Sequence, residues 1–397
     1  MQLSDIVILS GARTPIGSFG GALASQSPAQ LGTVAATAAI SRAGVDAAAV
    51  DLAVFGHIIT TNSDDVYLAR QIALQTGMAA SSNAFQVNRL CGSGLQAIIS
   101  AAQQLLLGDG QLALCGGAES MSQGAFLLPG VRKGLRVGHA AVTDLTLGIL
   151  TDPFGSGHMG ITAENIAAKY GFTRNQLDEF ALESQQRAAK AHQAGYFTEQ
   201  IVAVPLSGKT GTEPTLITTD EHIRPGTTLQ SLSQLKPAFQ ANGMVTAGNA
   251  SGLNDGAAAL ILATTQYANS QGLSPKARLV GYSMAGVEPS LMGLGPIPAV
   301  QQLLAKTGLA LGNIDVIESN EAFAAQALAV SQTLGFDPAK VNPNGGAIAL
   351  GHPVGATGAI LLVKTLYELE RIDGQFGLVT LCIGGGQGIA LLVERCS

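Results

Sequence analysis

Apolar residues over the first 120 positions fall alternately into short strand-like runs and longer helical stretches. Positions 6–10 and 52–55 have the length and apolar content of strands, whereas positions 28–43 have the spacing of a helix. A second helix is predicted at about 94–107, and its residues leave so little polar face that we expect it to be buried on most sides. Strands and helices in this order predict an α/β fold.

The pattern changes in the middle of the chain and then returns. The middle has glycine-rich turns and one polar helix at about 173–194, which together indicate an inserted region of loops and helices. After Gly256 the α/β alternation resumes and continues to Arg395. The predicted domains are an N-terminal half at 1–120 completed by about 248–270, an inserted loop domain at 121–247, and a C-terminal half at 271–397.

The two α/β stretches resemble each other in the order of their features. An apolar run begins at Asp51 about 40 residues before Cys91, and another begins at Asp315 a similar distance before His352. Each is followed by a strongly apolar helix and then by a strand that ends in a cysteine and a glycine cluster. A gene duplication would place Cys91 and His352 at equivalent helix starts, brought together by pseudo-twofold packing. Chance similarity and the shared grammar of α/β chains are the alternative explanation.

Composition and charge narrow the function. Of 397 residues, 47% are hydrophobic and 12% charged, so we expect a large core and consider a homo-oligomer plausible. A net charge of −6 with no run of Lys or Arg argues against nucleic acid as a partner. The first ten residues do not resemble a secretory signal, and no apolar stretch approaches about 20 residues free of charged or turn residues. We therefore expect a cytoplasmic protein with no membrane segment.

Cys91 lies directly before the predicted buried helix, in a turn that also contains Gly92 and Gly94. Unpaired backbone N–H groups at a helix N-terminus favour a thiolate and can hold an oxyanion, so this is a suitable place for a nucleophile. Glycines beside a cysteine also occur in ordinary tight turns. The four cysteines are far apart and form no Cys-x-x-Cys pair, which predicts free thiols and no metal site.

Two further candidates stand near the C-terminus, each among glycines. His352 lies in the segment 345–358 and Cys382 in the segment 381–386, where so many glycines indicate close approach of backbone to backbone or to a ligand. Asn320 and Glu321 follow an apolar strand and could hold a water molecule or orient the histidine. Each residue taken singly could equally be structural.

Six motifs, in this order, resemble those of the thiolase family, and the match covers the chain from end to end. They occupy residues 88–94, 157–160 with 162–165, 248–252, 320–323, 351–353 and 382–386. Residues 87–91 and 152–154 are similar in particular to the bacterial β-ketothiolases and acetyl-CoA acetyltransferases. The resemblance implies a thiolase-like fold of two duplicated α/β halves, layered α-β-α-β-α, with an inserted loop and helix domain.

The resemblance also implies an acyltransferase that joins and cleaves 3-ketoacyl thioesters reversibly. By similarity, Cys91 accepts the acyl group, His352 is the base that activates it, and Cys382 is a second acid/base acting on carbon. The family has two oxyanion holes, which here would be His352 with a water held by Asn320, and the backbone N–H groups of Cys91 and Gly384.

Coenzyme A, acetyl-CoA and other acyl-CoA molecules are the implied substrates, with no permanently bound cofactor. By similarity, the residues along the coenzyme path and the acyl site are Leu150, His158, Met159, Arg224, Ser231, Ser251, Leu253, Ala322 and Phe323. Because Met159 and Phe323 are bulky and apolar, we expect short 3-ketoacyl chains to be preferred. The family is commonly tetrameric, so a homotetramer with contacts from the region after Ser120 is expected.

The sequence leaves two other functions open and contains two misleading motifs. A ketoacyl synthase shares the duplicated fold but resembles a Cys-His-His or Cys-His-Asn set, and a non-catalytic acyl-CoA or lipid carrier would be expected to lose one of the three catalytic residues. The glycines at 155–160 fit a dinucleotide-binding pattern but do not follow a strand. Residues 207–210 end like a phosphate-binding loop but lack its first glycine, and we expect a surface turn there.

Overall fold

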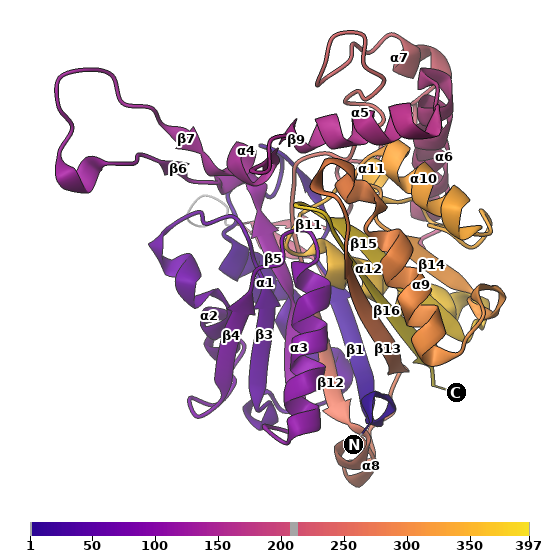
Figure 1. Cartoon of the computed structure of the whole chain (residues 1–397). Helices are drawn as coiled ribbons and strands as arrows, with labels where there is room; N and C mark the ends of the chain where they lie inside the picture. The colour runs from indigo at the N-terminus through magenta and orange to yellow at the C-terminus, as the bar shows by residue number, and fades with distance from the viewer. Residues whose placement is uncertain (1, 207–212, 397) are drawn as a thin grey trace.

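A computed structural model describes residues 2–206 and 213–396, so the turn expected at 207–210 lies outside the described residues. Its centre is a ten-stranded mixed sheet in the order β14-β15-β16-β13-β1-β12-β5-β3-β4, with β2 pairing β12 (Figure 1). The strands of the N-terminal half are β1 (Ile6–Arg13), β2 (Gly17–Ser18), β3 (Leu52–Gly56), β4 (Asn83–Val87), β5 (Leu112–Ser120) and β12 (Asn254–Thr264). Those of the C-terminal half are β13 (Ala277–Gly286), β14 (Val316–Ser319), β15 (Phe376–Ile383) and β16 (Gln387–Arg395).

Helices cover both faces of each half-sheet. In the N-terminal half they are α1 (Pro28–Ala43), α2 (Leu68–Gln75), α3 (Ser93–Leu107) and α8 (Thr265–Ser270). In the C-terminal half they are α9 (Pro296–Thr307), α10 (Ala324–Leu334), α11 (Ala347–Leu350) and α12 (Thr357–Ile372). Because α3 and α12 pack between the half-sheets while α1 and α9 lie outside, the layers are α-β-α-β-α. The predicted fold class is confirmed, and similar solved structures are described below.

The two halves repeat each other strand by strand. In each half the pairing runs antiparallel, antiparallel and then parallel, through β1-β12-β5-β3 in the first half and β13-β16-β15-β14 in the second. Asp51 accepts two successive backbone N–H groups at the start of β5 at 2.7 and 3.0 Å, and Asp315 does the same at the start of β15 at 2.7 and 3.0 Å. Equal distances at equivalent positions support a duplication.

A backbone irregularity is repeated as well. The register of β1 against β12 shifts between Ile8 and Ser10, and the register of β13 against β16 shifts between Leu279 and Gly281. Each shift is a β-bulge at the same place in its half, and bulges are retained features of a family rather than accidents of packing. The halves join where Val7 of β1 pairs with Arg278 of β13.

The repeat requires two corrections to the sequence prediction. Asp51 and Asp315 stand 264 positions apart (315 less 51), and the same spacing relates the first residues of α3 and α12, so these helices are equivalent as expected. The spacing of 264, however, makes Cys91 equivalent to Gly355 rather than to His352. His352 lies three residues farther from the start of α12 than Cys91 lies from the start of α3. Cys115 was expected to end its strand like Cys382, but it lies in the middle of β5. Shared motif order is a coarser guide than hydrogen-bond register.

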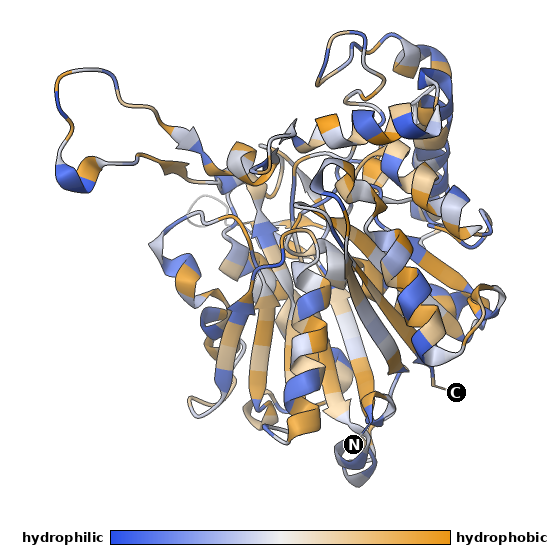
Figure 2. Ribbon diagram, viewed as in Figure 1, coloured by the Kyte–Doolittle hydropathy of each residue, from blue (hydrophilic) through white to orange (hydrophobic). Residues whose placement is uncertain are grey.

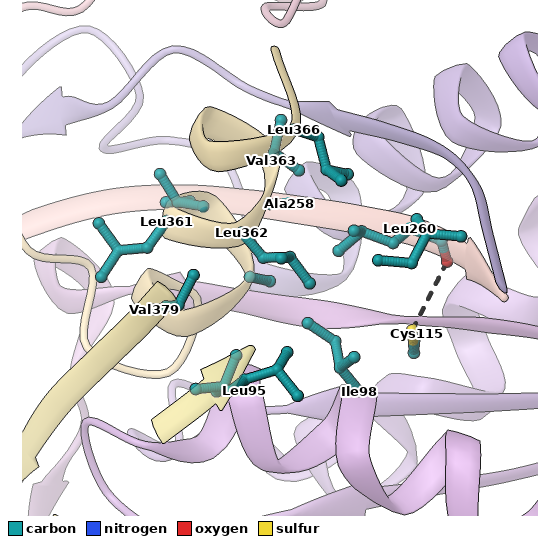
Figure 3. Close-up of a cluster of buried hydrophobic side chains, with 14 of the residues drawn as sticks. Leu95, Ile98, Cys115, Ala258, Leu260, Leu361, Leu362, Val363, Leu366 and Val379 are labelled. Atoms are coloured by element: carbon teal, nitrogen blue, oxygen red, sulfur yellow. Dashed lines mark hydrogen bonds between the residues drawn. The ribbon is translucent and has the colours of Figure 1, made fainter. Parts of the chain in front are cut away.

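The central layer is tight because both helices have glycine at their second position. A side chain on Gly94 of α3 would lie 2.8 Å from the nitrogen of Ala359, and one on Gly358 of α12 would lie 2.4 Å from the nitrogen of Leu95. Large apolar side chains of both helices fill the space beyond these contacts, against β5 and β12 (Figure 3). The helix starts, and the functional residues beside them, are therefore held close together.

The region between β5 and β12 forms a separate layer above one end of the sheet. Its helices are α4 (Leu145–Ile149), α5 (Met159–Tyr170), α6 (Arg174–Gln193) and α7 (Leu229–Ser233), with the short pairs β8 (Thr151–Asp152) with β9 (Gly157–His158) and β10 (Val204–Leu206) with β11 (Thr215–Ile217). An arm carrying β6 (Phe126–Leu127) and β7 (Thr143–Asp144) extends away from the body (Figure 1). Apolar residues recur along this arm although solvent surrounds it (Figure 2).

One 18-residue window, Leu90–Leu107, is long and apolar enough to cross a membrane by composition alone. It consists of the Cys91 turn and α3, which packs against β3, β5 and α12 in the core. The apolar character of this window is therefore explained by the position of α3 in the core of the fold.

Candidate active site

The Cys91 turn is organised by one serine hydroxyl. Ser93 Oγ accepts from the N–H of Arg89 at 2.8 Å and donates to the carbonyl of Leu90 at 2.6 Å, which closes a tight turn directly before α3. Leu90 has a φ of 46°, a left-handed conformation that is uncommon for a branched residue. Such strain persists only where the surroundings enforce it, and it clusters at functional sites. Cys91 keeps partial exposure at this point.

The Cys91 thiol experiences two opposing influences. Burial, with a smaller effect of the Glu119 charge, raises its pKa to about 11, while the backbone N–H groups of Gly384 and of Cys91 itself act in the opposite direction by favouring the thiolate. The resting residue is therefore a neutral thiol that needs a base. The same two N–H groups are positioned to stabilise an oxyanion on an attacked carbonyl.

His352 is a neutral imidazole in a defined orientation. Its Nδ1 lies 2.6 Å from Oγ1 of Thr357, and that hydroxyl donates to the carbonyl of Pro353 at 3.0 Å, so the imidazole must be the donor in the shorter bond. Nε2 therefore carries the free lone pair. Burial lowers the pKa of His352 to about 4, so the ring is uncharged at neutral pH and able to accept a proton.

Asn320 and Asn254 fix the histidine from two sides. Asn320 Nδ2 lies 3.4 Å from Nε2 of His352, and Asn254 Oδ1 accepts from the backbone N–H of His352 at 2.9 Å. Asn320 Oδ1 is buried and has no partner among the described residues, so it can accept a further hydrogen bond. Glu321 turns away, and its carboxylate accepts from Ser184 and Asn342 at 2.7 and 2.9 Å.

Cys382 lies at the end of β15 within an apolar cluster. The cluster joins Cys382 to Met159, Ala322 and Phe323, all three of which were expected to line the substrate site. Burial raises the pKa of Cys382, and the nearby Cys91 sulfur raises it further. A thiol with a high pKa is a strong base once ionised, which suits removal of a proton from carbon.

Gly384 packs closely against the side chains of Met159 and Leu90. A Cβ at this position would lie 2.2 Å from Cε of Met159 and 3.1 Å from Cδ1 of Leu90. The absence of a side chain therefore lets the backbone N–H of Gly384 approach Cys91 while Met159 closes the other side.

The predicted coenzyme residues separate into two groups. Leu150 and Leu253 pack in one apolar cluster with Cys91, and the backbone N–H of Ser251 donates to Ala322 at 3.0 Å. Arg224 and Ser231 lie on the exposed surface, and no described contact joins either to the cysteines. Ser231 instead forms a capping box with Thr228, the N-cap residue of α7.

Several residues of the site were missed by reasoning from sequence. Phe239 is one of them: it stacks on the predicted His158 with ring centroids 4.5 Å apart, and it meets the predicted Phe323 edge-on at 6.1 Å. Met292 packs in the same cluster as Cys382. Thr357 and Asn254 hold His352, as described above. Of these missed residues, only Thr357 could have been found from the sequence, because it stands five residues after His352. The other missed residues come from distant segments.

No group of three or more His, Cys, Asp or Glu that could hold a metal ion occurs at positions 2–206 or 213–396. The chemistry available from the described residues is a thiol beside a neutral imidazole, a second thiol, and a pair of backbone N–H groups.

Family models match nearly the whole chain: "Thiolase, N-terminal domain" at residues 6–266 and "Thiolase, C-terminal domain" at residues 273–395. Beta-ketothiolase BktB of Cupriavidus necator is 53% identical over 98% of this chain and 99% of its own. Acetyl-CoA acetyltransferase of Escherichia coli K12 is 48% identical over 99% of this chain and 100% of its own.

Solved structures agree with the sequence matches. Bacillus anthracis acetyl-CoA acetyltransferase superimposes with a TM-score of 0.96 at 43% identity, covering 98% of each chain. Human mitochondrial 3-ketoacyl-CoA thiolase in complex with CoA has a TM-score of 0.94 at 41% identity, also over 98% of each chain.

A duplicated α/β fold with two thiols and a neutral imidazole at its centre defines an acyl-transferring enzyme. The chain belongs to the thiolase family, and it is an acyltransferase of the β-ketothiolase and acetyl-CoA acetyltransferase type. The recognition made from six motifs is confirmed, and the rival ketoacyl synthase and carrier functions are not favoured.

Proposed function

We propose that Cys91, His352 and Cys382 divide the thiolase reaction among themselves. The observation that carries this proposal is the hydrogen-bonded tautomer of His352, whose Nε2 lone pair is free to accept a proton. When Cys91 attacks the acetyl-CoA thioester, its proton passes to His352. His352 passes this proton on to the departing CoA sulfur, and free CoA leaves with acetyl-Cys91 behind. Because thiol and imidazole are both neutral at rest, proton transfer accompanies attack.

Carbon–carbon bond formation then uses the Cys382 thiolate, which forms when Cys382 gives its proton to the neutral His352. It removes a methyl proton from a second acetyl-CoA, and the resulting enolate attacks acetyl-Cys91. Cys91 leaves as a thiolate and regains its proton from His352, so all protons balance. Asn320 and His352 would stabilise the enolate oxygen, and the N–H groups of Cys91 and Gly384 the tetrahedral oxygen. Thiolysis is the same sequence reversed.

Coenzyme A and acyl-CoA are the substrates, and the inserted region supplies the binding path. Leu150, Leu253 and Met159 border the two cysteines and would contact the pantetheine arm and acyl group. The exposed Arg224 is available for the nucleotide end, since guanidinium binds phosphate and stacks on adenine. We further propose a preference for short 3-ketoacyl chains.

A homotetramer formed through the arm is part of the proposal. Large apolar side chains are usually buried, yet this arm exposes Phe126 at 68% and Leu135 at 55%. Exposed apolar patches of this kind mark interaction sites. A cytoplasmic location is proposed on the free thiols, since Cys91, Cys115, Cys382 and Cys396 are all unpaired.

The test is the enolate absorbance of acetoacetyl-CoA, which thiolysis bleaches when CoA is added and binding alone does not. Wild-type enzyme is expected to bleach it, and Cys91→Ser to lose turnover while keeping CoA binding, because an alcohol ionises far less readily than a thiol. Cys396→Ser is the control, since Cys396 lies near the end of the chain outside the site. If Cys91→Ser turned over within about tenfold of wild type, a change of about 1.4 kcal/mol in the barrier, Cys91 would not be the nucleophile.

A further inference from the structure

A buried carboxylate lies behind the catalytic residues and contacts both halves of the molecule. Glu119, near the end of β5, is fully buried. Its Oε1 accepts from the N–H of Ile59 at 3.0 Å, and its Oε2 accepts from the N–H groups of Ile58 at 3.2 Å and Gly355 at 2.9 Å. Ile58 and Ile59 belong to the N-terminal half and Gly355 to the C-terminal half. One side chain therefore bridges the two.

The bridged segments are those that carry the catalytic groups. Ile58, Ile59 and Cys91 pack in one apolar cluster, so the loop held by Glu119 forms part of the wall around the nucleophile. Gly355 lies three residues after His352 on the same loop. The carboxylate thus connects the surroundings of the nucleophile to the loop of the base.

The segments around this bridge are tightly packed. A Cβ on Gly355 would lie 2.3 Å from Oε2 of Glu119. A Cβ on Gly56 would lie 2.5 Å from the carbonyl carbon of Ser93, the first residue of α3, and 2.8 Å from the carbonyl oxygen of Gly355. Backbone is therefore in contact with backbone on both sides, and a shift of one loop must displace the other.

A buried histidine pairs with this carboxylate. His57 Nδ1 lies 3.1 Å from Oε1 of Glu119 and 3.0 Å from the carbonyl of Ala118, and its Nε2 lies 3.6 Å from Oδ2 of Asp65. Burial lowers the pKa of His57, but the Glu119 charge and the hydrogen bonds outweigh it and raise the pKa to about 10. The imidazole is therefore a cation between two carboxylates. Asp65 is in turn anchored by Thr61 at 2.6 and 2.8 Å.

We propose that Glu119, clamped by His57, is a positioning residue that sets the distance between Cys91 and His352. This rests on the proposed function, because the distance matters only if Cys91 passes its proton to His352. Neither Glu119 nor His57 touches the reacting atoms. They act by keeping the turn that carries Cys91 and the loop that carries His352 in fixed relative positions where the two halves meet.

Glu119→Gln tests the proposal, because glutamine keeps the size but has one acceptor oxygen, and its amide NH₂ would face a backbone N–H. We expect kcat for thiolysis and the rate of acetylation of Cys91 both to fall about 100-fold, as misplacement by about 1 Å can produce, while the KM for CoA stays within about threefold. Loss of stability alone would not separate kcat from KM in this way.

Asp51→Asn is the matched control. Asp51 also holds two backbone N–H groups of the N-terminal half, but at the opposite end of β5. At a temperature where both variants are fully folded, Asp51→Asn should keep kcat within about twofold of wild type, since Asp51 does not position Cys91 relative to His352. The proposal is overturned if Glu119→Gln keeps kcat within about threefold, or if Asp51→Asn loses as much.

If Glu119→Gln does not fold, His57→Gln serves instead, because it removes the cation and leaves all three backbone bonds of Glu119 possible. A fall of kcat of about tenfold with unchanged KM supports the clamp, and unchanged kcat overturns it. Inactive wild-type enzyme would count against the proposed function rather than against the clamp.

Discussion

His352 donates from Nδ1 to the hydroxyl of Thr357 at 2.6 Å, and this bond fixes which ring nitrogen is free to act as a base. Thr357→Val would leave Nδ1–H without an acceptor and allow the ring to change tautomer or rotate. We expect kcat for thiolysis to fall about 10- to 100-fold, within the range of a lost acid–base contribution. The assay is the bleaching of acetoacetyl-CoA.

Thr365→Val is the control for that variant, because Thr365 is a buried threonine of the same helix whose hydroxyl donates only to Leu361 at 2.8 Å. It should lose some stability and keep kcat within about twofold. Equal kcat values for Thr357→Val and Thr365→Val would mean that the bond to Thr357 does not orient the base.

The two cysteines lie in separate apolar clusters, which predicts separable functions. Cys382→Ala should still be acetylated at Cys91 by acetyl-CoA but fail to form or cleave the carbon–carbon bond, because the proton on carbon needs the second thiol. Mass spectrometry of the intact protein measures the acetyl group.

Cys115→Ala should behave as wild type in both assays, because Cys115 is a core thiol that contacts the carbonyl of Leu260 at 3.7 Å within the sheet (Figure 3). A Cys382→Ala variant with native structure and no acetyl group would disprove the division of labour.

Two buried histidines with opposite charge states should shape the pH dependence of stability. The pKa of His352 is lowered to about 4, so its contribution is present above its ordinary value of 6.5 and is lost as the pH falls towards 4. The pKa of His57 is raised to about 10, so its contribution is present below 6.5 and is lost as the pH rises through 10. Urea denaturation across pH should show stability falling at both acid and alkaline pH, by at most about 3 kcal/mol from His352 and about 5 kcal/mol from His57.

The His57→Gln variant tests whether His57 causes the fall in unfolding free energy at alkaline pH. In this variant the fall in unfolding free energy between neutral pH and pH 10 should shrink while the fall at acid pH remains, because only the His57 cation has been removed. An unchanged fall at alkaline pH would show that His57 is not charged in the folded protein.

Much of the fold and the three central residues could be predicted because they leave local patterns. The helices at 28–43 and 94–107 follow from apolar spacing, and the three proposed catalytic residues stand beside glycines that mark close backbone contacts. Glu119 and His57 leave no such signal, since a lone polar residue at a strand end has the same appearance whether it is solvated or buried. Their partner Gly355 is more than two hundred residues away, so only the folded chain reveals the bridge.

The stacking of His158 on Phe239 was unpredictable for the same reason, because the two rings come from separate segments of the inserted region. The misplacement of Cys115 has a different cause. Motif order suggested that it ends its strand, but hydrogen-bond register, which the sequence does not display, places it opposite Leu260 in the interior of β5.

Met159 stands between the Cys382 cluster and a cavity, and this position should limit acyl chain length. It packs with Cys382 on one side, and on the other it lines a cavity of about 390 Å³ together with Leu90 and Phe154. Phe323 closes the cluster further. We expect the wild type to prefer acetoacetyl-CoA and chains of roughly five or six carbons, with some tolerance because methionine is flexible.

Met159→Ala should open the wall and shift the profile towards longer chains. Each methylene that can then be accommodated contributes about 1 to 3 kcal/mol of discrimination, so kcat/KM for an eight-carbon 3-ketoacyl-CoA should rise relative to acetoacetyl-CoA by at least about tenfold. Met292→Ala is the comparison, because Met292 lies in the same cluster but does not line the cavity. Removing it should weaken packing without the same gain for long chains. A wild type that prefers a ten-carbon substrate, or a Met159→Ala profile that does not move, would show that the chain-length limit lies elsewhere, while the assignment to the thiolase family would stand.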